Sequence, residues 1–209
     1  MTILVTIGPT QEPLDAMRIL SNRSTGNLGT SLSVAFAKKG HRVIALRGIG
    51  ATAETHELVR LGATIVPFTT TEELRSLFEK ISKTESINAV FHAAAVSDFY
   101  FPDSGNGKIP TSLGSLTLTL QPTPKLLPLL REWFPEAVII GWKFEAAGNR
   151  DEYLAIARNQ IVKNRTDGCV LNGPAYGEGF GFVKKEGELH HLSDSDSLCC
   201  FLGDLEKSF

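Results

Sequence analysis

A polar segment with two glycines precedes the first expected helix, and its residue types suit the binding of a phosphate group. The segment carries hydroxyl, amide and guanidinium side chains: Ser21, Asn22, Arg23, Ser24, Thr25, Gly26 and Gly29. At a helix N-terminus, backbone amides and the positive end of the helix dipole attract anions. The segment therefore predicts a phosphate site, although an elaborate helix cap with glycines for close packing would use the same residues.

The connection that leads to this segment is longer than a dinucleotide-binding turn. It runs from Gly8 to Gly26, whereas a dinucleotide fingerprint places G-x-G-x-x-G within about six residues of the first strand. That fingerprint is absent from the sequence at this point. The spacing therefore favours a phosphate-binding loop of another kind.

A carboxylate and a lysine follow a later apolar run. Asp98 comes after Ala94 and Ala95 at the end of an expected strand, where open α/β sheets bind ligands. Lys108 lies in an irregular segment, 101–114, rich in Gly, Pro, Ser and Asp. A compact cation on a flexible stem can approach a triphosphate there. A turn-forming aspartate and a solvated loop lysine are the alternative interpretations.

Apolar runs alternate with helical periodicities and predict a doubly wound, mostly parallel α/β sheet, Rossmann-like, with helices on both faces. The expected strands are 1–7, 42–46, 64–68, 89–95, 116–120, 137–142 and 169–171. The expected helices are 27–39, 54–61, 71–81, 124–133, 152–163 and 195–207. Segments 180–185 and 189–192 predict a small C-terminal β-hairpin. We expect a single domain over 1–209.

Composition and charge argue against several classes of protein. The net charge is -2 and the pI is about 6.2, which gives no basic field for a nucleic acid. No apolar stretch reaches the roughly 18 residues of a membrane span, and the start has no secretion signal. His and Cys residues show no zinc-binding spacing. We expect a cytoplasmic protein that binds neither nucleic acid nor membranes and has no dedicated metal ligands.

Several segments, taken in order, resemble one family. Thr6-Ile7-Gly8-Pro9-Thr10 with Glu12, Asp15 and Arg18, followed by 21–29, is similar to the opening of the phosphopantothenoylcysteine synthetases (phosphopantothenate–cysteine ligases) of coenzyme A biosynthesis. Later segments resemble the same family: 94–98, Lys108-Ile109, 122–125, 140–145, and Lys163-Asn164 with Asp167 and Asn172. The resemblance covers residues 3–172, which is far more specific than one short motif.

The resemblance implies a two-step ligase. The carboxylate of 4'-phosphopantothenate attacks the α-phosphate of CTP or ATP and releases pyrophosphate, and the amine of L-cysteine then displaces the nucleoside monophosphate. Both steps develop negative charge on oxygen atoms, so the site needs positioned cations and hydrogen-bond donors more than a strong base. Mg²⁺ is expected with the triphosphate, although no acidic pair marks a metal cage.

The resemblance also implies roles for individual residues. Asn22, which would hold the acyl phosphate or the substrate amide, and Lys108, which would stabilise the triphosphate, are the expected catalytic residues. The implied pantothenate-side contacts are Gly8, Thr10, Ser21, Arg23, Ser24, Thr25 and Gly26. The implied nucleotide contacts are Ala94, Ala95, Asp98, Lys108, Phe144 and Lys163. Structural roles remain open for four of these residues. Ala94 and Ala95 would also suit a crowded sheet, Phe144 would suit a hydrophobic core, and Lys163 would suit the C-terminal end of a helix.

The resemblance further implies a homodimer in which a neighbour's extension covers the substrate pocket. The hairpin within 180–192 is a candidate for that contact. Because no decarboxylase half precedes Met1, the chain resembles the single-function form, whose product a separate decarboxylase uses. Pro110 and Asn159 stand where the family usually has lysine. The run after Gly141 reads Trp-Lys-Phe-Glu, which is closer to the single-function and eukaryotic forms, and this leaves the choice between CTP and ATP open.

Two other functions remain open at this point. One is an NAD(P)-dependent reductase of the short-chain type, but none of Tyr100, Tyr153 and Tyr176 has a lysine four residues later to lower the pKa of a catalytic tyrosine. The other is a non-catalytic nucleotide-binding relative, which the departures at Pro110 and Asn159 motivate. Such a relative would release no pyrophosphate.

Overall fold

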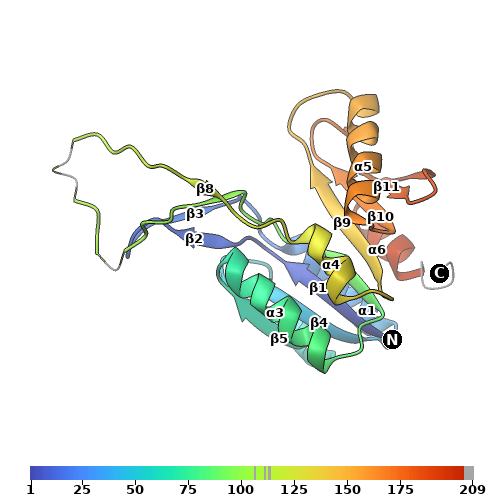
Figure 1. The fold of residues 1–209 in the computed structure, drawn as a ribbon. Helices are drawn as coiled ribbons and strands as arrows, with labels where there is room; N and C mark the ends of the chain where they lie inside the picture. Colours follow the sequence, from blue (N-terminus) through green and yellow to red (C-terminus); the bar gives the residue numbers. More distant parts are fainter. Residues whose placement is uncertain (106, 111, 113, 205–209) are drawn as a thin grey trace.

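An eight-stranded sheet forms the centre of the computed structural model, which describes residues 1–105, 107–110, 112 and 114–204. The strand order is β12-β11-β10-β9-β6-β1-β4-β5 (Figure 1). Six strands run parallel: β1 (Thr2–Ile7), β4 (Arg42–Gly48), β5 (Thr64–Phe68), β6 (Ala89–His92), β9 (Val138–Phe144) and β10 (Gly168–Asn172). The hairpin of β11 (Phe180–Lys184) and β12 (Leu189–Leu192) extends one edge with antiparallel strands. The predicted fold class is confirmed.

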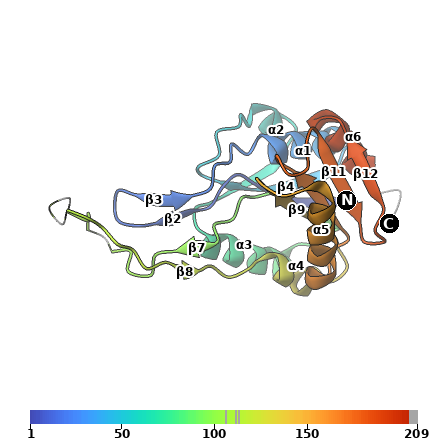
Figure 2. The same ribbon diagram turned by 90° about the horizontal axis from the view of Figure 1, so that it is seen from above.

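Helices cover both faces of the sheet, as Figure 2 shows from above. They are α1 (Asn27–Lys38), α2 (His56–Arg60), α3 (Thr71–Thr84), α4 (Leu127–Trp133), α5 (Arg150–Asn164) and α6 (Ser195–Asp204). Capping explains where two of them begin, because Thr70 Oγ1 accepts from the Glu73 amide and Asn149 forms a capping box with Glu152. Within the described residues, none of the helices combines the length and apolar character needed to cross a bilayer.

The two faces have separate cores, because successive residues of a strand point to opposite sides. Ile3, Val5 and Ile7 of β1 pack in a cluster with buried residues of α1, α2 and α6. Leu4 of the same strand packs with α3 and α4 instead. Helix α5 lies beside α4 and packs on Cys169 of β10 and its neighbours. The carboxyl ends of the parallel strands are thereby held at one rigid edge.

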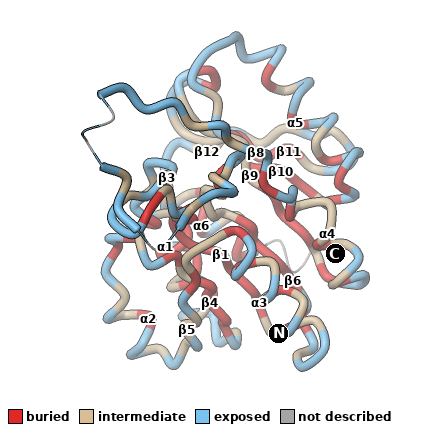
Figure 3. Tube along the Cα trace, turned by 60° about the vertical axis from the view of Figure 1, so that its left-hand side comes forward, coloured by how far each residue is buried: buried red, intermediate tan, exposed pale blue. Residues whose placement is uncertain are grey.

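Two short antiparallel ladders project from this body. Strand β2 (Gln11–Pro13) pairs with β3 (Ile19–Ser21), and β7 (Phe99–Tyr100) pairs with β8 (Gln121–Pro122). Both views of the ribbon show the two ladders side by side and pointing away from the sheet. The described residues of 11–21 and 99–122 are termed the arm. Most of the central sheet is buried, whereas the described residues of the loop between β7 and β8 are mostly exposed (Figure 3).

The structure corrects three expectations. Residues 116–120 form no strand despite their alternation, because the partner β7 pairs with the residues that follow them. Strand β6 ends at His92, since the Ala94 amide donates to Thr6 Oγ1 (3.0 Å) and leaves the ladder. The long first connection contains β2 and β3, which the sequence did not predict. Helix α6 is described to Asp204, and the expected end of that helix, 205–207, lies outside the described residues.

Candidate active site

A cleft of about 1340 Å³ lies at the carboxyl ends of the parallel strands. Its wall comes from the stretches 22–29, 92–98, 123–128 and 142–144, parts of 156–164, and the single residues Thr52 and Asn172. Open α/β sheets bind their ligands at this edge. The cleft therefore brings together segments that are far apart in the sequence, including most of the residues that the sequence predicted.

Two glycines allow the loop after β1 to meet the start of α1. Gly8 and Gly26 both have φ of 79°, the left-handed region that favours glycine. A Cβ on Gly8 would lie 2.5 Å from Ala51 Cβ, and one on Gly26 would lie 2.9 Å from Ile7 Cγ2. Helix α1 thus begins directly on the cleft, with no side-chain cap bond and no acidic residue in its first turn. Such a helix end offers backbone donors and a positive dipole end to an anion.

Asn22 links the polar segment to the loop after β6. Its Nδ2 donates to the carbonyl oxygen of Val96 at 3.0 Å, and the residue is exposed on the cleft wall. Behind it, Ser21 Oγ donates to the Thr10 carbonyl oxygen (2.7 Å), and Thr10 Oγ1 accepts from the Ser97 amide (2.9 Å). These bonds fix the wall at which the Asn22 amide lies.

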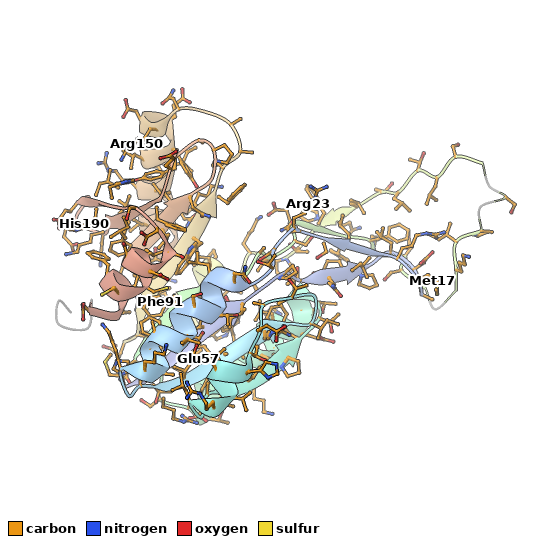
Figure 4. All side chains as sticks on the ribbon, turned by 180° about the vertical axis from the view of Figure 1, so that it is seen from behind. Met17, Arg23, Glu57, Phe91, Arg150 and His190 are labelled. Carbon is orange, nitrogen blue, oxygen red and sulfur yellow. The ribbon has the colours of Figure 1, made fainter. Side chains whose placement is uncertain are left out.

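The predicted pantothenate-side residues divide into two groups. Arg23, Ser24, Thr25 and Gly26 line the cleft. Gly8, Thr10 and Ser21 are not among its lining residues, and the structure places them where they support the wall through close packing and hydrogen bonds. Figure 4 shows Arg23 where the arm leaves the body. A direct contact of the second group with substrate stays a prediction.

A buried histidine and a threonine hold the alanine segment of the cleft. Thr6 Oγ1 accepts from the Ala94 amide, so its own proton can go to His92 Nδ1, which lies 2.9 Å away. Burial lowers the pKa of His92 to about 4, so the imidazole is neutral at pH 7. The pair fixes the backbone at Ala94 and Ala95, both of which line the cleft.

The cleft carries more positive than negative charge. Its described wall has four cationic side chains, Arg23, Lys125, Lys143 and Lys163, and one carboxylate, Asp98. Lys125 forms an ion pair with Asp98, and Lys143 pairs with Glu145 at 2.8 Å. This balance suits a polyanionic ligand. The sequence predicted no role for Lys125 or Lys143, although both lie in segments, 122–125 and 140–145, that carry the family resemblance.

Five of the predicted nucleotide contacts line the cleft together: Ala94, Ala95, Asp98, Phe144 and Lys163. Phe144 ends β9 and remains 63% exposed, which leaves its ring face open to a planar base. The ring lies against Gly173, where a Cβ would approach Phe144 Cε2 to 3.0 Å. An exposed aromatic ring on a rigid strand is a suitable platform for stacking.

Of the two predicted catalytic residues, Asn22 lines the cleft and Lys108 does not. Lys108 lies exposed on the arm and is not among the cleft's lining residues. The neighbouring Gly107 carbonyl oxygen accepts from the Ala16 amide at 3.2 Å, so this part of the loop is held against the β2–β3 turn. In this chain the cleft and the expected cationic loop are therefore separate.

The described residues offer no ready-made metal cage. No group of three or more His, Cys, Asp and Glu side chains among them could hold an ion. Asp98, the carboxylate on the described cleft wall, is engaged by Lys125. Mg²⁺ often relies on substrate phosphates with one or two carboxylates. Magnesium that is held mainly by a bound triphosphate stays a prediction.

Comparisons with known proteins agree with this geometry. Residues 1–199 match the family model described as DNA/pantothenate metabolism flavoprotein C-terminal domain. A coenzyme A biosynthesis bifunctional protein CoaBC of Thermococcus kodakarensis is 30% identical over 170 residues, which are 81% of this chain and 40% of that protein. A phosphopantothenate–cysteine ligase of Homo sapiens is 30% identical over 198 residues, covering 68% of this chain and 63% of that protein. The crystal structure of the DNA/pantothenate metabolism flavoprotein from Streptococcus pneumoniae has a TM-score of 0.83 at 26% identity and covers 100% of this chain and 98% of that one.

Proposed function

The chain belongs to the family of DNA/pantothenate metabolism flavoprotein C-terminal domains, and on this premise we propose that it joins 4'-phosphopantothenate to L-cysteine. The observation that carries the proposal is the cationic cleft at the start of α1, bordered by the exposed Phe144. The relative from Homo sapiens is named for this ligase activity. The family match favours the ligase over a short-chain-type reductase.

The reaction consists of two displacements. A carboxylate oxygen of phosphopantothenate forms a bond to the α-phosphorus of CTP or ATP, and the bond to pyrophosphate breaks. The cysteine amine then bonds to the acyl carbon, loses a proton, and expels the nucleoside monophosphate together with the former carboxylate oxygen. Preorganised donors and cations are the main means of stabilising both transition states.

The pantothenate phosphate binds at the N-terminus of α1. Arg23, Ser24, Thr25 and Gly26 supply the side chains and close backbone approach there, and the helix dipole adds to the attraction. Asn22 points an amide at the acyl phosphate, where a neutral donor stabilises negative charge without changing its own protonation. These roles agree with the position of all five residues on the cleft wall.

The nucleotide binds on the side of β6, β9 and α5. Its base stacks on Phe144, while Ala94 and Ala95 allow the ribose to come close to the backbone. Lys163 and Lys125 neutralise the phosphates, for which Lys125 exchanges its ion pair with Asp98. Magnesium bound to the triphosphate supplies further charge neutralisation when present. Either CTP or ATP fits this description.

A homodimer would explain the position of Lys108. The lysine lies outside the cleft of its own chain, and the arm that carries it exposes the apolar side chains of Met17 (73%), Ile19 (51%) and Phe99 (48%). Exposed apolar groups on a projecting element are typical of an interaction site. We infer that the arm of one copy covers the cleft of the other and brings Lys108 to its triphosphate.

A nucleotide panel tests the proposed function. The protein is incubated with phosphopantothenate and either CTP or ATP, and pyrophosphate release is followed in a single turnover before cysteine is added. Release with one of the two nucleotides, followed by the amide product on addition of cysteine, is the expected result. Nucleotide binding without any pyrophosphate release would instead identify a non-catalytic relative and overturn the proposal.

A further inference from the structure

Asp15 and Arg18 belong to the opening motif, yet neither lines the cleft. They lie in the turn between β2 and β3 on the arm, and Figure 4 shows Met17 of the same turn far from the central sheet. The Asp15 side chain is only 2% exposed although it sits on a projecting turn. A carboxylate buried in such a place needs an explanation, because charges are rarely buried without dedicated partners.

The Asp15 carboxylate uses its two oxygens differently. Oδ1 accepts from the Met17 and Arg18 amides, each at 2.8 Å, and so closes its own turn. Oδ2 accepts from the Ile109 amide at 3.0 Å and forms an ion pair with Arg18. The Ile109 amide is the largest of the causes that lower the pKa of Asp15, ahead of the burial that raises it. The second oxygen thus reaches across to the loop between β7 and β8.

The bonds to this loop bracket Lys108. On one side, the Gly107 carbonyl oxygen accepts from the Ala16 amide at 3.2 Å. On the other side, the Ile109 amide donates to Asp15, and the Ile109 carbonyl oxygen accepts from Arg18 at 3.4 Å. The backbone of Lys108 is therefore fixed at both neighbours, while its side chain stays exposed. Ordering a loop backbone costs conformational entropy. Fixed positions at Gly107 and Ile109 are therefore expected if the location of Lys108 matters for function.

We propose that Asp15 is a positioning residue for Lys108: its Oδ2, together with Arg18, clamps Ile109 so that the ammonium group is presented from a defined point of the arm. This inference rests on the proposed ligase function. The arm carries the lysine as one unit to the triphosphate, and the clamp reduces the freedom that the lysine would otherwise lose in the transition state.

A double-mutant cycle tests the clamp. Asp15→Asn keeps one acceptor oxygen for the Met17 and Arg18 amides but loses the acceptor for Ile109. We expect it to lower kcat about tenfold with little change in the KM for nucleotide, and Lys108→Gln to lower kcat roughly 10- to 100-fold. In the Lys108→Gln background, Asp15→Asn should lower kcat by less than about twofold, because residues that act together are non-additive.

A control and a second measurement separate the possible failures. Glu72→Gln removes a carboxylate that pairs with Arg75 on α3, away from the cleft, and should leave kcat unchanged in both backgrounds. Amide hydrogen exchange at Ile109 should accelerate at least about tenfold in Asp15→Asn, whether or not the chain is a ligase. Equal losses of kcat in both backgrounds, or no loss in either, would overturn the positioning role. Unchanged exchange at Ile109 would overturn the clamp itself, whereas faster exchange in a protein without ligase activity would contradict the proposed function alone.

Discussion

The cleft and the arm are built in opposite ways. The cleft wall rests on buried strand ends, and its supporting polar groups, Thr6, Thr10, His92 and Ser97, are themselves buried and hydrogen-bonded. The arm has two short ladders, exposed apolar side chains and an irregular loop held by the Asp15 turn. The difference indicates that the body holds the hydrogen-bond donors of the cleft in place, whereas the arm extends away from the sheet (Figures 1 and 2).

Changing the donor in the cleft should have the largest effect. Asn22→Asp replaces an amide that can donate to an acyl phosphate by a carboxylate that repels it. We expect kcat to fall about 100- to 1000-fold, as when an oxyanion-binding donor is lost, with the melting temperature nearly unchanged. Asn149→Asp is the matched control, since Asp also caps α5, and steady-state kinetics should be normal. Normal kinetics of Asn22→Asp would remove that residue from its role.

Mixing two impaired variants tests whether the cleft of one copy works with the arm of the other. Asn22→Asp impairs the cleft of its own chain, and Lys108→Gln removes the cation from the arm of its own chain. If the arm of one copy covers the cleft of the other, each mixed dimer contains one site in which both residues are intact. Random assortment of equal amounts should restore about one quarter of the wild-type rate. Activity that stays at the level of the separate variants, with mixed dimers demonstrated by mass spectrometry, would mean that each arm serves its own chain.

Substituting glycines in the two regions should affect stability to different degrees. Gly8 and Gly114 have similar positive φ values, 79° and 74°, but only Gly8 is crowded, with Ala51 Cβ 2.5 Å from the position of a new Cβ. Gly8→Ala should cost about 3 kcal/mol through strain and overpacking, and Gly114→Ala about 1 kcal/mol through strain alone. Urea unfolding of both variants gives the comparison. Equal costs would contradict a rigid cleft wall.

Acid should weaken the cleft through His92. Its pKa is lowered by burial from 6.5 to about 4, so the unfolded chain binds a proton more readily, and stability falls as pH drops from 6.5 towards 4. At pH 5 this group should cost about 2 kcal/mol relative to pH 7. Urea unfolding at both pH values gives the loss of unfolding free energy between pH 7 and pH 5. In His92→Gln this loss should be smaller than in the wild type by about 2 kcal/mol. An identical loss in the two proteins would indicate that other groups dominate.

The body of the fold was predictable from the sequence, because its signals are local. Continuous apolar runs such as 1–7 and 42–46 predict buried parallel strands, and the threonines and acidic residues at the start of α3 predict its cap, as Thr70 confirms. Ala94, Ala95 and Asp98 could be placed at the ligand-binding edge because they follow a parallel strand, and segment 21–29 could be placed there because it leads into the helix after the first strand. For this reason most predicted cleft residues line the cleft.

The arm was not predictable to the same extent, because short exposed strands leave little pattern. Strands β2 and β3 have three residues each, and one contains a proline. Alternation at 116–120 indicated a strand, but a strand also needs a partner for its hydrogen bonds. The position of Lys108 depends on contacts with the distant Asp15, which no local pattern encodes. Lys125 was missed because an exposed lysine acquires a role only through its neighbours in space.

Transfer of an oxygen label tests the central claim most directly. Phosphopantothenate with ¹⁸O in its carboxylate is converted with the preferred nucleotide and L-cysteine, and the released nucleoside monophosphate is analysed by mass spectrometry. Attack on the α-phosphate predicts one ¹⁸O atom in the monophosphate and none in pyrophosphate. Label in inorganic phosphate with release of a nucleoside diphosphate, or an unlabelled monophosphate, would contradict the acyl-nucleotide route.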